Sequence, residues 1–353
     1  MSRDVNPTSV AEPQVWDAGQ IAAALRATDC SACAVTVIGY GTMGRHYVKA
    51  LRALRVRRIR VVNRSPERLR ELEAVPEVTI VASDVRRLKL RPEPGELAIL
   101  AVPVPELVAG TEHLIRLGFR LLLVEKPIAL AASTIERLAS LCEAQGVEAW
   151  GAFNRLAYPA FHEVKARATR EGGITSVTYT MTEMIRPDWP QRFAEEELAR
   201  WGVANSLHVA SMAHGLIGLP KVLEAYQAGH GRLSWHPSGT VFVGAGISEQ
   251  DIPFSYHADW GSKGRWSLEV HTAAASYRLC PLEQLFTKTD SLGEWQPVPV
   301  TAFAPEVKGG VVEEVASILQ PAVREMIALP SLRADAKFVR AAEHIFGYTG
   351  DTR

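Results

Sequence analysis

Cysteine is scarce in this chain, with only four among 353 residues. So few cysteines in a chain of this length do not form a disulfide framework, and a reducing cytoplasm is the simplest expectation. Cys30 and Cys33 do form a C-x-x-C pair. The pair stands before the first predicted strand, and not at the start of a helix that follows one, so we expect no redox role for it.

Long apolar runs and an excess of charge are also missing. No run reaches the length of a membrane span, and residues 1–7 lack the apolar core of a signal peptide. Lys and Arg number 39 and so do Asp and Glu, so no overall field favours nucleic acid or an anionic membrane. With 47% hydrophobic and 22% charged residues, the composition is that of a soluble globular protein. We expect two domains and no nucleic-acid, membrane or metal partner.

One stretch carries a recognisable pattern, and the rest of the chain is organised around it. The apolar residues 35–38 run straight into Gly39-x-Gly41-x-x-Gly44, and the spacing predicts a helix over 45–54. Strand, glycine turn and helix in this order are the context of the dinucleotide fingerprint. Gly39 permits the tight turn, Gly41 lets a pyrophosphate approach the backbone, and Gly44 allows the helix to pack on the strand. The alternative is a purely structural glycine turn.

The second predicted strand, residues 59–63, ends without the acidic residue that binds the ribose 2′-hydroxyl in NAD-selective domains. Asn63 can bond to the ribose instead. Arg64 and Ser65, which follow it, can hold a 2′-phosphate. We therefore favour NADP over NAD as the cofactor.

Further strands over 97–102, 121–124 and 147–153 alternate with helices and complete a predicted six-strand parallel sheet. The strand over 121–124 runs into Glu125-Lys126-Pro127. Packing does not explain a lysine at the end of a buried strand. The ends of such strands are where ligands gather, so Lys126 is a candidate for the site.

After Phe153 the pattern changes. The spacing predicts one helix over 154–168, a strand over 174–184 and a helix over 207–219. Five closely spaced strands between 222 and 279, with glycine turns, indicate an antiparallel sheet, and two helices, 311–328 and 334–346, close the chain, the first kinked at Pro321. We expect an extension with a short helix over 1–33, a Rossmann domain over 34–153 and an α/β domain over 154–353.

Residues 34–350 resemble the glucose–fructose oxidoreductase, inositol dehydrogenase and rhizopine catabolism family, Gfo/Idh/MocA. The resemblance rests on the glycine fingerprint, on Glu125-Lys126-Pro127, on Phe153-Asn154-Arg155 with Pro159, and on His208 ten residues before Gly218. It implies a Rossmann doubly wound parallel sheet followed by an α/β domain with a largely antiparallel open sheet. It also implies hydride transfer between NAD(P) and a carbon of a sugar, nucleotide-sugar or cyclitol, in a homodimer or homotetramer joined through the C-terminal sheet.

The resemblance assigns roles to two residues. Lys126 matches the lysine that lies beside the nicotinamide and hydrogen-bonds the reacting hydroxyl, and His208 matches the histidine that passes the proton. Family members often have the Lys–Pro peptide cis, so we expect a cis Lys126–Pro127 bond, with the Lys126 amine near His208. The family commonly has Asp four residues before this histidine, where this chain has Ala204. Asn205, its neighbour, can orient substrate or His208 but cannot serve as a base.

The residues expected to contact the cofactor are Gly39, Tyr40, Gly41, Thr42, Met43, Gly44, Asn63, Arg64, Ser65, Ala101, Val102, Pro103, Glu125 and Lys126. Those expected to contact the substrate are Asn154, Arg155, Tyr158, Arg186, Trp189, Asn205 and His208, with Asp188, Trp235 and His236 as further candidates. Two alternatives stay open: a ligand sensor without catalytic activity on the same fold, and a reductase of cyclic imines or enones.

Overall fold

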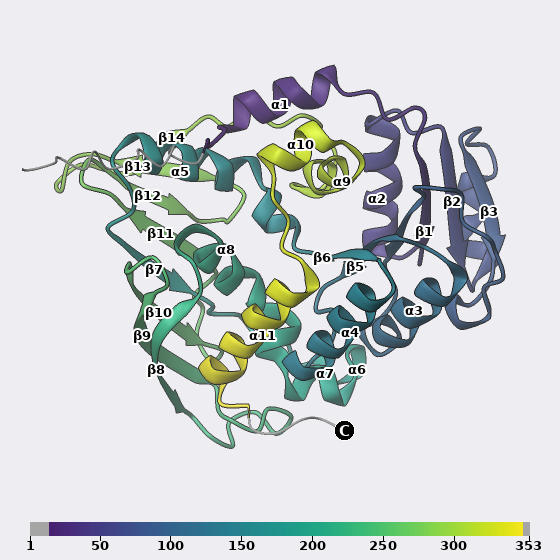
Figure 1. The fold of residues 1–353 in the computed structure, drawn as a ribbon. Coiled ribbons are helices and arrows are strands. Elements are labelled where there is room, and N and C mark those ends of the chain that lie inside the picture. The colour runs from purple at the N-terminus through teal and green to yellow at the C-terminus, as the bar shows by residue number, and fades with distance from the viewer. Residues whose placement is uncertain (1–13, 349–353) are drawn as a thin grey trace, which may run out of the picture.

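The computed structural model describes residues 14–348, and they form two sheets with helices between and around them (Figure 1). The first sheet has six strands in the order β3-β2-β1-β4-β5-β6, and all of its pairs are parallel. The strands are β1 Ala34–Ile38, β2 Arg58–Asn63, β3 Val78–Ala82, β4 Leu97–Leu100, β5 Leu121–Glu125 and β6 Glu148–Ala152. Strands β1 and β4 are buried along their whole length, as expected where helices cover both faces of a parallel sheet.

The strand order reverses between β1 and β4, and a doubly wound sheet has its ligand crevice at that point. The helices of this half are α1 Ala18–Ala27, α2 Thr42–Ala53, α3 Val104–Leu117 and α4 Ala132–Ala144, with 3-10 turns η1 Pro66–Leu72 and η2 Val85–Arg87. Helix α3 stops at Gly118, whose φ of 102° is a left-handed conformation suited to glycine.

The second sheet has eight strands in the order β14-β13-β12-β11-β7-β10-β9-β8. Only β7 and β10 pair in parallel, and the other pairs are antiparallel. The strands are β7 Ser176–Thr180, β8 Pro220–Ala228, β9 Val241–Ser248, β10 Pro253–Asp259, β11 Ser267–His271, β12 Ser276–Leu279, β13 Leu285–Lys288 and β14 Gln296–Val298. The predicted fold class, a parallel Rossmann sheet with a largely antiparallel second sheet, is confirmed.

Two of the predicted helices are broken in the structure. The single helix expected over 154–168 is wrong: a 3-10 turn, η3 Asn154–Ala157, is separated from α5 Pro159–Arg170 by Tyr158 in an extended conformation, which the residue before a proline prefers. The helix expected over 311–328 divides into α9 Val311–Leu319 and α10 Pro321–Met326, because Gln320 is extended. A proline therefore starts the second helix in both cases.

The elements between the two sheets bring distant parts of the chain together. Helices α8 Leu207–Ile217 and α11 Leu332–Phe346 lie between the sheets in Figure 1, and α11 also packs on α4. Helix α9 packs on α2 in the core of the first half. A short π-helix, Gly202–Ser206, precedes α8, and α6 Trp189–Arg192 and α7 Glu195–Ala199 stand before it. Within residues 14–348 no helix is both long and apolar enough to cross a membrane.

The three fingerprint glycines meet three different steric constraints. Gly39 has φ +95°, and a Cβ there would lie 2.2 Å from the Ala101 carbonyl oxygen. A Cβ on Gly44 would lie 2.0 Å from the Gly39 oxygen, whereas a Cβ on Gly41 would meet nothing within 4 Å. Gly39 and Gly44 are thus required by packing, and Gly41 faces open space.

We expect Gly44→Ala to destabilise the folded chain by about 1–3 kcal/mol, because its Cβ overpacks helix α2 against the turn. Gly41→Ala is the matched control and should change the free energy of unfolding by no more than about 0.5 kcal/mol, since it touches no packed feature. Urea denaturation followed by circular dichroism measures both. Equal unfolding midpoints for the two variants would contradict the assignment.

Candidate active site

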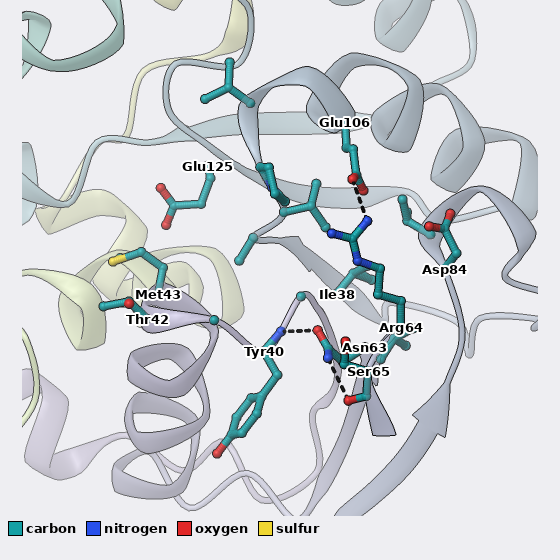
Figure 2. A pocket seen from close by; sticks show the side chains of 18 of the residues that line it. Ile38, Tyr40, Thr42, Met43, Asn63, Arg64, Ser65, Asp84, Glu106 and Glu125 are labelled. Atoms are coloured by element: carbon teal, nitrogen blue, oxygen red, sulfur yellow. Dashed lines mark hydrogen bonds and ion pairs between the residues drawn. The ribbon is translucent and has the colours of Figure 1, made fainter. Parts of the chain in front are cut away.

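A cavity of about 530 Å³ opens at the carboxyl ends of β1, β2, β4 and β5, where the strand order reverses (Figure 2). We call it the first cavity. All of the residues predicted to contact the cofactor line it except Gly44, which lies beneath the turn. Residues that the sequence analysis did not single out complete the lining: Ile38, Val62, Arg68, Ser83, Asp84, Val85, Val104, Glu106, Phe193 and Glu197.

The fit of this cavity to a dinucleotide rests on its glycine turn. Gly41 is open to the cavity and forms the N-cap of α2 without a side-chain hydrogen bond. The first N–H groups of α2 are therefore free for a ligand, and the N-terminus of a helix favours phosphate. The donor set at this end suits a pyrophosphate.

The residues predicted to contact the ribose and its phosphate, at the end of β2, also bond to other parts of the protein. Asn63 accepts a hydrogen bond from the Tyr40 backbone N–H at 3.1 Å and donates one to the Ser65 carbonyl at 3.0 Å, so its amide holds the glycine turn (Figure 2). Arg64, predicted to be free for a phosphate, forms an ion pair of 3.3 Å with Glu106 of α3. Because the Arg64 side chain is 64% exposed, this pair contributes little to stability and can be exchanged for another anion.

Lys126 leaves the end of β5 and points into the protein. The Lys126–Pro127 peptide is cis, as predicted. The Lys126 Nζ donates a hydrogen bond of 2.7 Å to the Ala204 carbonyl oxygen, so the amine is turned away from bulk solvent. Ala204 belongs to the π-helix that runs directly into α8. A lysine on the first sheet is thereby bonded to the turn that presents His208.

His208 is buried in the second residue of α8, with 8% of its surface exposed. Its ring centre lies 5.9 Å from that of Trp266, and its Nδ1 has no hydrogen-bond partner in the described chain. An unpartnered ring nitrogen in a buried site is costly, and His208 itself lines neither the first cavity nor the second cavity described below.

Burial moves the pKa values of both residues downward. For Lys126, burial and then the charge of Arg155 lower the pKa to about 7, although Glu125 and Glu183 oppose the shift. For His208, burial and then the charges of Lys126 and Arg155 hold the pKa well below its usual value. Near neutral pH the histidine is uncharged, and the lysine is the group whose protonation changes.

A carboxylate that the sequence analysis missed organises this region. Glu183, three residues beyond the end of β7, is buried and accepts hydrogen bonds from Trp201 Nε1 at 3.1 Å, Asn205 Nδ2 at 2.7 Å and Ser206 Oγ at 2.6 Å. All three donors lie in or beside the π-helix. Glu183 therefore fixes the turn whose carbonyl holds Lys126. Asn205 was predicted to orient substrate or His208, and its amide N–H is donated to this carboxylate.

A second buried group lies behind the lysine. Glu125 accepts a hydrogen bond of 2.7 Å from the hydroxyl of Tyr47 in α2, and burial raises the pKa of Glu125. Lys308 is close enough for its charge to oppose that shift, and its Nζ contacts Met43 Sδ at 3.1 Å. A second lysine, not predicted, thus reaches the fingerprint from the C-terminal part of the chain.

The predicted substrate residues separate into two groups. Arg155, Arg186 and Trp189 line a second cavity, also of about 530 Å³, together with Glu183, Trp266, Glu283 and basic residues 263 and 265. We call it the second cavity. Lys126 lines the first cavity, and the charges of Arg155 and Glu183, which line the second, both act on its pKa.

The other predicted substrate residues have structural partners. The Tyr158 hydroxyl donates to Glu283 at 3.0 Å, and Asn154 Nδ2 donates to the Gly309 carbonyl at 2.8 Å. Asp188 pairs with Arg192 at 3.4 Å. His236 was a candidate and is wrong: its two ring nitrogens bond to Gly239 O and Tyr348 Oη, both at 2.8 Å.

His236 packs among aromatic rings of the second half, with Trp260 at 4.7 Å and Trp235 at 6.0 Å between ring centres. Neither Trp235 nor His236 lines the first or the second cavity. They belong to the core beneath the second sheet. In the described chain, no group of three or more His, Cys, Asp or Glu side chains is placed to hold a metal ion.

The sheet order, the glycine turn and the cavity at the reversal point are those of a Rossmann fold, which is joined here to a second, largely antiparallel sheet. A family profile described as shikimate / quinate 5-dehydrogenase matches residues 21–123, which cover most of the first sheet. Myo-inositol dehydrogenase Hyg17 of Streptomyces leeuwenhoekii is 33% identical over 134 residues, or 38% of this chain. That match spans 40% of the length of the curated relative.

Two solved structures are similar over most of the chain. UDP-N-acetylglucosamine 3-dehydrogenase GnnA from Acidithiobacillus ferrooxidans has a TM-score of 0.66 at 13% identity, covering 89% of this chain and 96% of that one. The WlbA dehydrogenase from Bordetella pertussis, in complex with NADH and UDP-GlcNAcA, has a TM-score of 0.64 at 14% identity, covering 89% and 94%. The chain has the fold of the Gfo/Idh/MocA-type oxidoreductases, as its resemblance to them predicted.

We expect Glu183→Leu to destabilise the protein by about 2–4 kcal/mol, because three buried donors lose a charged or strongly polar acceptor. Glu183→Gln keeps one amide oxygen and should lose less. Glu283→Gln in the same cavity is the control, since Glu283 is exposed, and it should change the free energy of unfolding by about 0.5 kcal/mol or less. Chemical denaturation decides, and a Glu183→Leu variant as stable as the control would show that Glu183 does not hold the π-helix.

Proposed function

We propose that this protein is an NAD(P)-dependent oxidoreductase that moves a hydride between the nicotinamide and a carbon of a sugar, nucleotide-sugar or cyclitol. The observation that carries the proposal is the position of Lys126, which lines the inner end of the first cavity and is bonded to the turn that presents His208. The relatives support it, since their names describe dehydrogenases of myo-inositol and of UDP-N-acetylglucosamine.

Different residues of the first cavity would bind different parts of the cofactor. The open N-terminus of α2 at Gly41 receives the pyrophosphate, and Arg64, Ser65 and Arg68 stand at the adenosine end. Glu125 and Lys126 line the opposite part of the cavity, at the end of β5. When bound, the nicotinamide supplies the chemistry of hydride transfer.

We assign the transfer of the substrate hydroxyl proton to Lys126. A lysine with a pKa of about 7 can take the proton of a hydroxyl during oxidation and return it during reduction. His208, uncharged at neutral pH, is assigned the role of assisting the lysine from the start of α8. These roles refine the expectation that His208 alone passes the proton.

We further propose that the second sheet joins subunits into a homodimer or homotetramer. Its outer face carries exposed apolar side chains on β8 and β9, among them Val222, Tyr226 and Val243. Tyr226 and Val243 are direct cross-strand partners, so they form one continuous apolar surface. We also propose that the chain divides into an extension over 1–33, a first domain over 34–153 and a second domain over 154–353. Helix α9, from the second range, packs on the first domain.

For oxidation of a substrate found among nucleotide-sugars and cyclitols, kcat/KM should rise with pH up to about 7, the pKa of Lys126, and then level, because the neutral amine is the base. The reduction direction should show the mirror-image dependence. Lys126→Met should lower kcat/KM by about 100- to 10,000-fold and abolish this limb of the profile.

Lys165→Met is the control, since that lysine of α5 lines neither the first nor the second cavity. It should leave rate and profile unchanged. Turnover by Lys126→Met at the wild-type rate, with the same pH profile, would overturn the role of this lysine.

We expect NADPH to bind more tightly than NADH. The reason is that Arg64 and Ser65 occupy the place of the acidic residue that binds the ribose 2′-hydroxyl in NAD-selective domains. Arg64→Ala should weaken the binding of NADPH by about 1–3 kcal/mol and leave the binding of NADH nearly unchanged. Glu106→Gln releases Arg64 from its ion pair and should therefore strengthen the binding of NADPH but not that of NADH. Fluorescence titration of both cofactors measures this, and equal losses for both in Arg64→Ala would show that Arg64 only stacks on the adenine.

A further inference from the structure

Arg155 is a cation at the site that lacks an anionic partner. Its Nε and Nη1 are shielded from solvent and have no hydrogen-bond partner among residues 14–348. Its guanidinium carbon lies 5.1 Å from the centre of the Trp266 ring and 5.9 Å from that of Tyr158. Aromatic faces of this kind attract a guanidinium without neutralising its charge.

Other shielded arginines in this protein are paired. Arg60 forms an ion pair of 3.0 Å with Glu96, and Arg200 forms one of 2.9 Å with Glu343. An arginine does not lose its proton in a protein, and a shielded charge without a partner costs folding free energy. Arg155 is therefore an exception that a ligand would relieve.

The nearby carboxylates already have other partners. Glu183 accepts three hydrogen bonds from the region of the π-helix, and Glu283 accepts the Tyr158 hydroxyl at 3.0 Å. Both line the second cavity with Arg155. The cavity thus contains carboxylates, yet neither is paired with this guanidinium.

The entrance of the second cavity has an excess of positive charge. Arg186, Lys263 and Arg265 line it and are exposed. Burial raises the pKa of Glu183, which weakens the negative charge that could balance them. Such a cleft concentrates anions and guides them inward.

Arg155 also lies close to the proposed reacting centre. Arg155 and His208 both lie against Trp266, whose ring centre is 5.1 Å from the guanidinium carbon and 5.9 Å from the imidazole centre. The charge of Arg155 also lowers the pKa of both Lys126 and His208. It stands on η3, directly beyond the end of β6, and the amide of Asn154 anchors that turn to the Gly309 carbonyl at 2.8 Å. An anion bound to Arg155 would therefore sit beside the oxygen on which the lysine acts.

We propose that Arg155 binds a carboxylate of the substrate in the second cavity, so that the substrate is a hydroxy acid or sugar acid whose carboxylate lies next to the reacting carbon. A planar guanidinium held between rings presents a fork that matches a carboxylate. The placement of the reacting carbon rests on the proposed function. The anion site itself does not.

The test uses the full chain and titrates glycolate, the smallest 2-hydroxy acid, against ethylene glycol, which has a hydroxyl in place of the carboxylate. Tryptophan fluorescence is the readout, because Trp266 faces the guanidinium. Wild type should show a saturable change with glycolate and none with ethylene glycol. Arg155→Gln should weaken glycolate by about tenfold or more, whereas Arg186→Gln at the entrance should change it by less than about threefold.

Two further measurements keep the outcomes distinct. Arg155→Met removes an uncompensated charge, so its melting temperature should equal or exceed that of wild type, whereas a structural arginine would lower it. Glycolate is titrated with and without NADP⁺, and NADP⁺ binding is measured separately, so that the two proposals are tested apart. If the protein binds no NADP⁺, the oxidoreductase proposal fails and the glycolate site is unaffected. Glycolate binding that survives Arg155→Gln, no glycolate binding at all, or tighter Arg155-dependent binding of inorganic phosphate would overturn the carboxylate assignment.

Discussion

The hydrogen bond from Lys126 Nζ to the Ala204 carbonyl joins the two halves of this protein at its site. One end is fixed by strand β5 of the parallel sheet, and the other by the π-helix before α8. A backbone carbonyl carries only a partial charge, so it compensates a buried ammonium less than a carboxylate would. Burial therefore prevails, and the pKa of Lys126 falls to about 7. The low pKa of Lys126 is thus a consequence of its burial against a neutral acceptor.

The geometry of that bond depends in turn on Glu183. Its carboxylate takes one donor beside the π-helix and two within it, at 3.1, 2.7 and 2.6 Å. Wide π turns are uncommon and often mark functional sites, because their backbone hydrogen bonds are poorer than those of an α-helix. A buried acceptor that satisfies three side-chain donors offsets this weakness. An acidic residue is therefore present near the lysine, but it acts on the turn and reaches Lys126 only through space.

The parts of the fold that the sequence predicted are those set by local chemistry. The glycine fingerprint fixed the turn after β1, because Gly39 and Gly44 are sites where no Cβ fits and Gly41 is a site where the backbone is open. The break before Pro159 was also readable, since a residue before proline avoids the helical region, but an apolar pattern continuous across it favoured one long helix. Strands β3, β13 and β14 were not located, because they lie at or next to sheet edges and are mostly only partly buried, so they lack the burial of β1 and β4.

The site could be predicted only where a residue lies next to a motif. Lys126 was selected because it follows a buried strand, and His208 only because it matches a family position; the roles of both remain predictions. Glu183 was missed because its three donors lie 18 to 23 residues away in sequence and nothing local marks it. Arg64 was placed correctly, but its ion pair with Glu106, 42 residues later, depends on how α3 packs beside β2. Partners of this kind are fixed by tertiary structure, which a single sequence does not contain.

A chain with zero net charge has nonetheless gathered cations at one place. The charges of Lys126, Arg155 and Lys308 all lower the pKa of His208, and Arg155 and His208 both lie against Trp266, at 5.1 and 5.9 Å from the centre of its ring. Mutual repulsion and desolvation make this arrangement unfavourable in the free protein. A ligand that brings negative charge recovers that free energy on binding, and binding to the folded state alone stabilises the fold by the same amount. The charges of Glu125 and Glu183 offset part of this cost at Lys126, and an anionic cofactor and substrate of the kind proposed above would offset more of it on binding.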